Sequence, residues 1–163
     1  MGKFEILKTK KIVLPSVNVV TQLDKNVMTT IDGLNKKLGQ YKSIIVCEIE
    51  GVGYEVVDGS KYFQLLKRNG EKKVLCYNLG KIKNSDKLLY RIALNTHQSR
   101  LDYLGIAEII SHLSKSEHKN TIANKTGLDL ESVEKYSTLL DFDWNDFNRK
   151  QFNSQFNPFE DER

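Results

Sequence analysis

A glycine turn at Asp58-Gly59-Ser60-Lys61 is the first place where this chain could do chemistry. It follows a short run of alternating apolar residues and precedes a helical pattern. A turn that opens a helix exposes backbone N–H groups, which favour an anionic ligand, and Lys61 adds positive charge. Ser60 or Asp58 as an ordinary helix cap explains the same pattern. The turn therefore predicts either a phosphate site or a simple helix start.

A second candidate lies between Asn120 and Leu140, which fit the spacing of a helix-turn-helix. Ala123 stands where two helices touch, Gly127 where the chain turns, and Val133 where the second helix packs. A small residue permits close helix approach, and glycine permits a left-handed backbone at the turn. The second helix of such a motif enters the major groove of DNA.

The residues expected on the exposed side of that second helix are mostly acidic. Ser132 and Lys135 are predicted to reach bases or phosphates, and Lys119 and Lys125 to touch the DNA backbone. The acids are unfavourable near phosphates, so a helical module that packs on the first part of the chain or on a protein partner is the alternative. The expected exposed set is Asp129, Glu131, Ser132, Glu134, Lys135 and Ser137.

The remaining reactive residue types predict no catalytic or metal site. Cys47 and Cys76 are far apart, which favours two buried free thiols in a reducing compartment. The histidines and a run of aspartates lack the partners that a zinc or calcium site needs. No Ser/His/Asp set or phosphate-binding GxxxxGK[ST] loop is present. The histidines and aspartates in question are His97, His112, His118, Asp141, Asp143 and Asp146.

The first hundred residues must fold into a compact α/β unit that positions the glycine turn. The helix predicted over 24–38 carries apolar residues at helical spacing, and Gly39 ends it. The predicted strands are 11–15, 43–49, 54–57 and 73–77, and the other helices are 61–68 and 86–95.

Beyond Arg100 the pattern is helical only. Residues 101–113 form a strongly amphipathic stretch, and two shorter helices follow on either side of Gly127. The tail from Asn145 has no clear period and is expected to be loosely ordered. The predicted organisation is an α/β domain over 1–100, a helical unit with the helix-turn-helix over 101–145, and a tail over 146–163.

Charge divides the chain at the same place. The 163 residues carry a net charge of +4. Residues 1–100 hold 18 Lys and Arg against nine Asp and Glu, and residues 101–163 hold seven against 12, so the nets are +9 and −5. The basic part fits a nucleotide or nucleic acid, or is a solvated lysine-rich surface.

Composition excludes several classes of protein. Hydrophobic residues make up 39% of the chain, enough for a core, so a wholly disordered chain is excluded. No run of about 18 apolar residues exists, which excludes a membrane span. The first residues lack the apolar stretch of a signal peptide, so a cytoplasmic location is expected.

Three blocks resemble the ParB/sulfiredoxin-like superfamily, and ParB-type partition proteins in particular. Ile44-Ile45-Val46 is similar to a family strand, and 53–70 to the family's "GYE-aliphatic-V" stretch with its helix and closing glycine. Residues 97–108 resemble the segment that leads from the α/β domain into the helical unit. The order of these blocks agrees with the family over roughly residues 10–140.

The resemblance implies a ParB/sulfiredoxin-like α/β (α+β) domain followed by an all-α helix-turn-helix unit. It implies a homodimer that binds double-stranded DNA, and a Walker-type partition ATPase as a partner. It also implies a nucleotide, CTP in many members, held here by Gly59, Ser60, Lys61 and Arg100. Other members of the superfamily are nucleases, and sulfiredoxins use ATP.

The sequence departs from the family at both nucleotide motifs. Residues 15–21 contain no arginine where CTP-binding members have one, and Gly59-Ser60-Lys61-Tyr62 stands where they have "GERR". A phosphate clamp needs several convergent cations or amides, so whether this chain keeps the nucleotide is left open. The sulfiredoxin catalytic cysteine has no counterpart in the motifs.

Three functions are consistent with these observations. The leading hypothesis is a DNA-binding protein for plasmid, phage or chromosome partition or for transcription control. The second is a protein interaction module on a ParB-like scaffold that has lost its ligand. The third is an enzyme of the superfamily, a nuclease or a CTPase-like nucleotide hydrolase, for which the sequence offers no carboxylate cluster.

Overall fold

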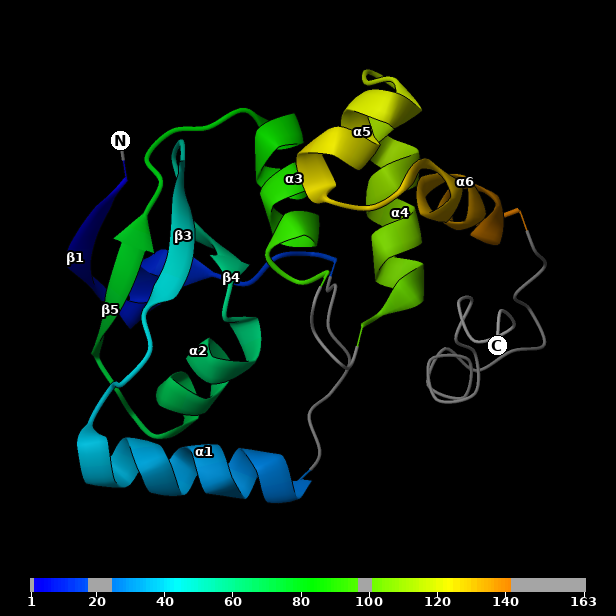
Figure 1. Cartoon of the computed structure of the whole chain (residues 1–163). Helices are drawn as coiled ribbons and strands as arrows, with labels where there is room; N and C mark the ends of the chain where they lie inside the picture. The colour runs from blue at the N-terminus through cyan, green and yellow to red at the C-terminus, as the bar shows by residue number, and fades with distance from the viewer. Residues whose placement is uncertain (1, 18–24, 97–100, 142–163) are drawn as a thin grey trace. The chain divides into compact units, whose positions relative to one another are not determined.

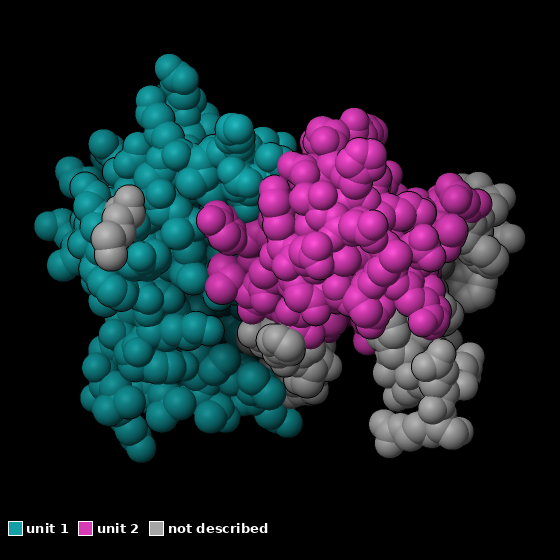
Figure 2. Space-filling model, turned by 45° about the horizontal axis from the view of Figure 1, so that its top comes forward, with its two compact units in different colours: residues 1–16, 22–87 teal, residues 17–21, 88–163 magenta. Residues whose placement is uncertain are grey.

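The computed structural model describes residues 2–17, 25–96 and 101–141 (Figure 1). Internal contacts divide the chain into two compact units (Figure 2). Unit 1 consists of Met1–Ser16 and Gln22–Lys87, and unit 2 of Val17–Thr21 and Leu88–Arg163.

Unit 1 is built on a five-stranded mixed sheet with the strand order β1-β5-β3-β4-β2 (Figure 1). The β1–β5 and β3–β4 pairs are antiparallel, and the β3–β5 and β2–β4 pairs are parallel. The strands are β1 (Lys3–Lys8), β2 (Ile12–Val13), β3 (Ile44–Ile49), β4 (Gly53–Asp58) and β5 (Lys73–Asn78).

In the described part of unit 1, helices α1 and α2 accompany the sheet, together with a 3-10 helix η1 (Thr9–Lys11) and the first turn of α3 (Asn84–Ala93). Helix α2 (Ser60–Arg68), close to the predicted range 61–68, buries Phe63, Leu65 and Leu66 against the sheet. The core also contains residues from every strand: Leu7, Ile12, Ile44, Val46, Val56, Val74 and Cys76. Because apolar side chains from both layers meet here, the sheet and α2 share one core.

Helix α1 (Lys25–Leu38) forms where the sequence predicts it, but it packs on an unexpected side. Met28 and Ile31 pack against the core of unit 1, and Asn35 is the only buried residue of this helix. The apolar residues Leu34 and Leu38 are 41% and 68% exposed. The apolar spacing therefore identifies the helix without identifying its packed face.

Unit 2 is helical. Its helices are α4 (Tyr103–Leu113), α5 (Lys119–Thr126) and α6 (Leu130–Leu139), together with the part of α3 (Asn84–Ala93) that follows Lys87. Its core includes Leu89, Ile92, Ile106, Ile110, Leu113, Ile122, Val133 and Tyr136. The division falls within α3 and not at residue 100, because Leu88, Leu89 and Ile92 pack with residues of α4.

The mixed α/β class and its helical second part agree with the sequence prediction, and two strands differ from it. The predicted strand over 11–15 is reduced to β2, and β1 precedes it. An alternating pattern of apolar and polar residues predicts a strand whose apolar side is buried. Strand β1 does not follow this rule, because its apolar residues Phe4 and Ile6 lie on the exposed side. Within the described residues, no helix is long and apolar enough to cross a membrane.

Candidate functional site

Helices α5 and α6 are joined by a three-residue turn that begins at Gly127. The glycine has a φ of 77°, and its backbone N–H donates to the Ala123 carbonyl over 3.0 Å. Ala123 and Val133 are both buried in the core of unit 2. The structure thus brings together the three positions that the sequence singles out, with the small residue at the helix contact and the glycine at the turn.

The start of α6 is fixed by Asp129. Its Oδ1 accepts a hydrogen bond of 2.6 Å from the Ser132 backbone N–H, as an N-cap residue does. Hydrogen bonds from the backbone and side chain of Ser132 lower the pKa of this carboxyl below its usual range. Asp129 therefore carries a full negative charge at neutral pH at the very point where α6 begins.

The prediction that Ser132 is exposed is wrong. Its side chain lies on the inner side of α6, and the residue is 5% exposed, beside Val133 and on the same face as Tyr136. Because Asp129 starts the helix, Ser132 falls at its third position, where the packed face begins. Ser132 thus belongs to the buried surface of α6.

The three lysines of this region each lie close to a glutamate. Lys135 Nζ is 3.0 Å from a Glu131 carboxylate oxygen within α6, and Lys119 Nζ is 3.9 Å from one of Glu134. Lys125 Nζ is 3.6 Å from Glu117. All three lysine side chains are at least 38% exposed. Such surface pairs are weak and screened by salt, so the lysines can exchange a carboxylate for a phosphate.

The start of α2 is the second candidate site. Gly59 is its N-cap residue with a φ of 87°, and the Gly59 carbonyl accepts the Phe63 N–H over 2.9 Å. Glycine suits this place because an L side chain there would be strained, although a Cβ would have room at 3.7 Å from Ile44. Ser60 and Lys61 form the first turn of the helix and are half-buried.

Only part of the predicted phosphate patch can be located. Gly59, Ser60 and Lys61 are brought together by the turn between β4 and α2. Arg100 and His97 lie outside the described residues, as do the aspartates at 143 and 146. The contribution of Arg100 to a phosphate clamp therefore stays a prediction.

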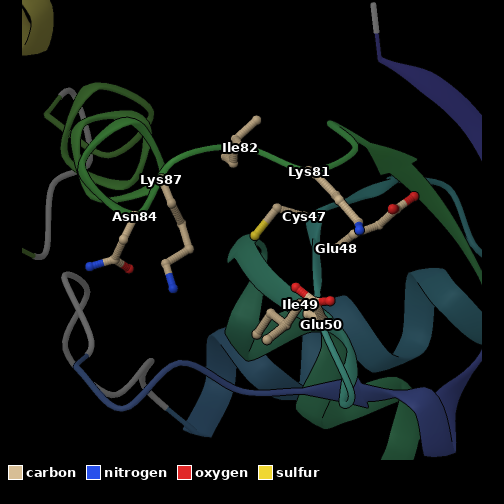
Figure 3. A pocket seen from close by; sticks show the side chains of 8 residues that line it. All are labelled: Cys47, Glu48, Ile49, Glu50, Lys81, Ile82, Asn84 and Lys87. Carbon is tan, nitrogen blue, oxygen red and sulfur yellow. The ribbon is translucent and has the colours of Figure 1, made fainter.

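A pocket that the sequence does not reveal lies elsewhere in unit 1 (Figure 3). Its volume is about 300 Å³, and residues from β3 and the turn after it, from the loop after β5 and from the first turn of α3 line it. Close by, Lys87 Nζ forms a half-buried ion pair of 2.9 Å with Glu55. The lining residues are Cys47, Glu48, Ile49, Glu50, Lys81, Ile82, Asn84 and Lys87. Two lysines and two glutamates balance each other, so the pocket has no preference for an anion.

The cysteines are free and buried, as the sequence predicts. Burial, with a further contribution from Glu5, raises the pKa of the Cys76 thiol to about 11. A thiol with so high a pKa is protonated at neutral pH and is a poor nucleophile. In the described part of the chain, no group of three or more His, Cys, Asp or Glu side chains could hold a metal ion.

The fold is that of ParB-like proteins. No protein-family model matches the sequence, and no curated protein matches it either. Solved structures do: a C-terminally truncated ParB from Caulobacter crescentus complexed to the centromeric parS site matches with a TM-score of 0.54 and 15% identity over 85% of this chain and 72% of that one.

Two further structures support the same conclusion. The Caulobacter crescentus protein complexed with CTP-gamma-S matches with a TM-score of 0.51 and 15% identity over 96% of this chain and 95% of that chain. A Pnob8-like ParB-N domain matches with a TM-score of 0.56 and 12% identity over 94% of this chain and 67% of that chain. At such identities the comparison establishes the fold and leaves the activity to be argued from the site.

Proposed function

We propose that this protein binds double-stranded DNA through α5 and α6 and acts in plasmid, phage or chromosome partition or in transcription regulation. The observation that carries the proposal is the buried Ala123 and Val133 on either side of the Gly127 turn, within a fold like that of a ParB solved on its parS site. Lys119, Lys125 and Lys135 are the proposed phosphate contacts.

The test is a titration of labelled duplex DNA at several salt concentrations. Each lysine that meets a phosphate contributes about 0.9 to the slope of log affinity against log salt. A variant with Lys119, Lys125 and Lys135 changed to Gln should therefore bind more weakly and show a slope smaller by roughly 2.7. A variant with Lys25 and Lys37 of α1 changed to Gln is the matched control. Equal slopes for the two variants would contradict the proposal.

A nucleotide site at the start of α2 is a further part of the proposal. It is supported by the turn geometry of Gly59, Ser60 and Lys61 and by the neighbouring ParB structure with CTP-gamma-S. Calorimetric titration with CTP should show binding that Lys61→Gln weakens and that Lys67→Gln, on the exposed end of the same helix, leaves unchanged. Absence of any CTP binding would remove this part and leave DNA binding standing.

A homodimer and a Walker-type partition ATPase partner belong to the same proposal. Sedimentation of the protein with and without duplex DNA tests the dimer, and co-sedimentation with a purified partition ATPase tests the partner. A single monomeric species under all conditions would reject the dimer.

A protein interaction module is the second candidate, favoured by the acidic surface of α6. Glu131 and Glu134 are exposed, lie next to Lys135 and Lys119, and lower the positive potential of this face. Changing both glutamates to Gln discriminates between the two functions. DNA binding predicts tighter duplex binding by this variant, whereas a module that recognises a basic protein predicts no duplex binding by either form.

A further inference from the structure

Strands β1 and β5 present an open ladder of side chains that the proposed DNA site does not use. The antiparallel register places Phe4 opposite Tyr77, Ile6 opposite Leu75, and Lys8 opposite Lys73. The alternation of a strand puts all six side chains on one face of the sheet. Phe4 is 65% and Ile6 69% exposed, so this apolar face is open to solvent.

The other face of the same two strands is firmly packed, which makes the open face a rigid support. Leu7, Val74 and Cys76 point into the core of unit 1. The Gln40 side chain accepts a 2.6 Å hydrogen bond from the Leu75 N–H and donates one of 2.8 Å to the Leu75 carbonyl. Strand β1 forms an outer edge of the sheet (Figure 1).

The aromatic pair at one end of the ladder has a defined geometry. The Phe4 and Tyr77 ring centroids are 5.0 Å apart with an interplanar angle of 61°, an edge-to-face arrangement. Gly2 lies against the Tyr77 ring, where an added Cβ would come within 2.7 Å of its atoms. Because Tyr77 is held from both sides, the exposed Phe4 ring is supported in place.

The other end of the ladder is strongly basic. Thr9 donates two hydrogen bonds to the Lys72 carbonyl, of 3.1 Å from its N–H and 3.2 Å from its hydroxyl. These bonds bring the chain segments 8–11 and 72–73 together, although they are far apart in the sequence. Lys8 and Lys73 lie opposite each other at this end of the ladder, and the joined segments carry three more exposed lysines. None of the five forms a salt bridge within the described residues: Lys8, Lys10, Lys11, Lys72 and Lys73.

We propose that this face, the β1–β5 ladder, binds single-stranded nucleic acid. Unpaired bases stack on Phe4 and the neighbouring apolar pairs, while Lys8 and Lys73, with the exposed lysines of the two joined segments, neutralise the phosphates of the same strand. Duplex DNA fits less well, because its bases are already stacked inside the helix and offer nothing to the exposed aromatic ring. A protein partner with an apolar surface also fits less well, because it would cover Phe4 and Ile6 but leave the lysines without a counter-charge.

The surface is separate from the proposed duplex site. It consists only of residues of unit 1, whereas α5 and α6 belong to unit 2. The two proposals therefore fail independently: the lysines of α5 and α6 control duplex binding, and the ladder controls single-strand binding.

The first experiment measures fluorescence anisotropy of labelled single-stranded DNA and RNA oligonucleotides with the full chain. Loss of one stacked base lowers the affinity roughly tenfold, so Phe4→Ala should weaken the binding of both DNA and RNA oligonucleotides by about that factor. Phe4→Trp should restore the binding, since it keeps an aromatic face. Leu38→Ala on α1, where the leucine is 68% exposed, is the matched control and should have no effect.

The second experiment follows the salt dependence. Each lysine neutralised by a single strand contributes about 0.7 to the slope of log affinity against log salt, so a Lys8→Gln/Lys73→Gln variant should lower the slope by roughly 1.4. The Lys25→Gln/Lys37→Gln variant should keep the slope of the unchanged protein. The affinities for DNA and RNA oligonucleotides of the same sequence, measured side by side, show which kind of strand the protein prefers.

Three results would overturn the proposal. One is a single-strand affinity that Phe4→Ala leaves unchanged while the lysine changes lower it, because the binding is then only electrostatic. Another is a Phe4→Ala change that weakens duplex binding as much as it weakens single-strand binding, because the ladder would then not distinguish unpaired bases. The third is binding to vesicles with anionic lipid that Phe4→Ala abolishes without any effect on oligonucleotides, which would assign the face to a membrane surface.

Discussion

At the residue scale, single backbone positions decide how α5 and α6 are joined. Gly127 adopts a φ of 77°, which L side chains rarely reach, and no atom lies within 4 Å of a Cβ placed there. The requirement for glycine is therefore conformational and not steric. The spacing of Ala123, Gly127 and Val133 predicts this turn because each position has a separate physical reason.

We expect Gly127→Ala to lower the free energy of unfolding by about 1 kcal/mol, the cost of placing an L residue in the left-handed region. Gly33→Ala is the matched control, because Gly33 lies within α1 and also has nothing within 4 Å of an added Cβ. Gly33→Ala should raise the free energy of unfolding by roughly 0.5–1 kcal/mol. Urea unfolding followed by circular dichroism measures both, and a Gly127→Ala protein as stable as the original would refute the strain argument.

Asp129 allows a prediction about pH. Its pKa is lowered in the folded protein by the hydrogen bonds of Ser132, so its stabilising contribution is full above the unfolded pKa of about 3.9 and is lost as the pH falls through the folded value. Asp129→Ala should cost about 1 kcal/mol at pH 7. The difference in free energy of unfolding between the Asp129→Ala variant and the original protein should become smaller below about pH 4.

The measurement is unfolding at a series of pH values between neutral and acid. Asp129→Asn is the control, because the amide still caps α6 and does not titrate. The Asp129→Asn variant should retain most of the stability at pH 7, and the contribution of its amide to the stability should not change as the pH falls. A gap between the Asp129→Ala and original proteins that stays constant down to pH 2 would contradict this role.

At the element scale, sequence identifies most helices and strands but not always the side on which they pack. The described helices and strands β3, β4 and β5 form close to the predicted ranges. Helix α1 is the exception in packing: a polar residue, Asn35, is buried in place of the apolar Leu34 and Leu38. Spacing in sequence cannot reveal this, since the reason is a partner far along the chain, Tyr62.

The Tyr62 hydroxyl donates a 2.7 Å buried hydrogen bond to Asn35 Oδ1 and so ties α1 to α2. Tyr62→Phe should therefore lower the stability by about 1–3 kcal/mol, because it removes the donor for a buried acceptor. The double variant Tyr62→Phe/Asn35→Leu should recover part of that loss, since both polar partners are then gone. A double-mutant cycle by urea unfolding gives the interaction energy, and additive single effects would show that the bond does not dock α1.

Strand β1 shows a second limit at this scale. Its exposed side chains, Phe4 and Ile6, are apolar, so the ordinary rule that strands bury their apolar face gives no sign of it. The same reversal makes the β1–β5 ladder a candidate binding surface. The strand that sequence patterns fail to predict therefore forms one half of the proposed binding surface.

At the scale of the whole molecule, the order of sequence blocks predicts the ParB-like fold better than any single motif does. The basic first part and the acidic second part correspond broadly to units 1 and 2, although the structural division falls within α3. The net charge of +9 for residues 1–100 gathers in part at Lys8, Lys10, Lys11, Lys72 and Lys73. The pairing of β1 with β5 places Lys8 opposite Lys73, and the Thr9 hydrogen bonds to Lys72 join the segments that carry the other lysines, so sequence alone could not predict this basic region.

Each unit has a core of its own, and this leads to a prediction about how stability is distributed. Ile110 is fully buried among residues of unit 2, and Val46 among residues of unit 1. Ile110→Ala should cost about 2–5 kcal/mol through lost contacts and the cavity left behind. Hydrogen exchange should show the loss of protection in α4, α5 and α6, while the amides of β3 and β5 keep theirs; Val46→Ala should produce the reverse. Equal loss in both sets of amides for either variant would mean that the two cores unfold as one cooperative unit, because a local opening exposes only the amides of its own core.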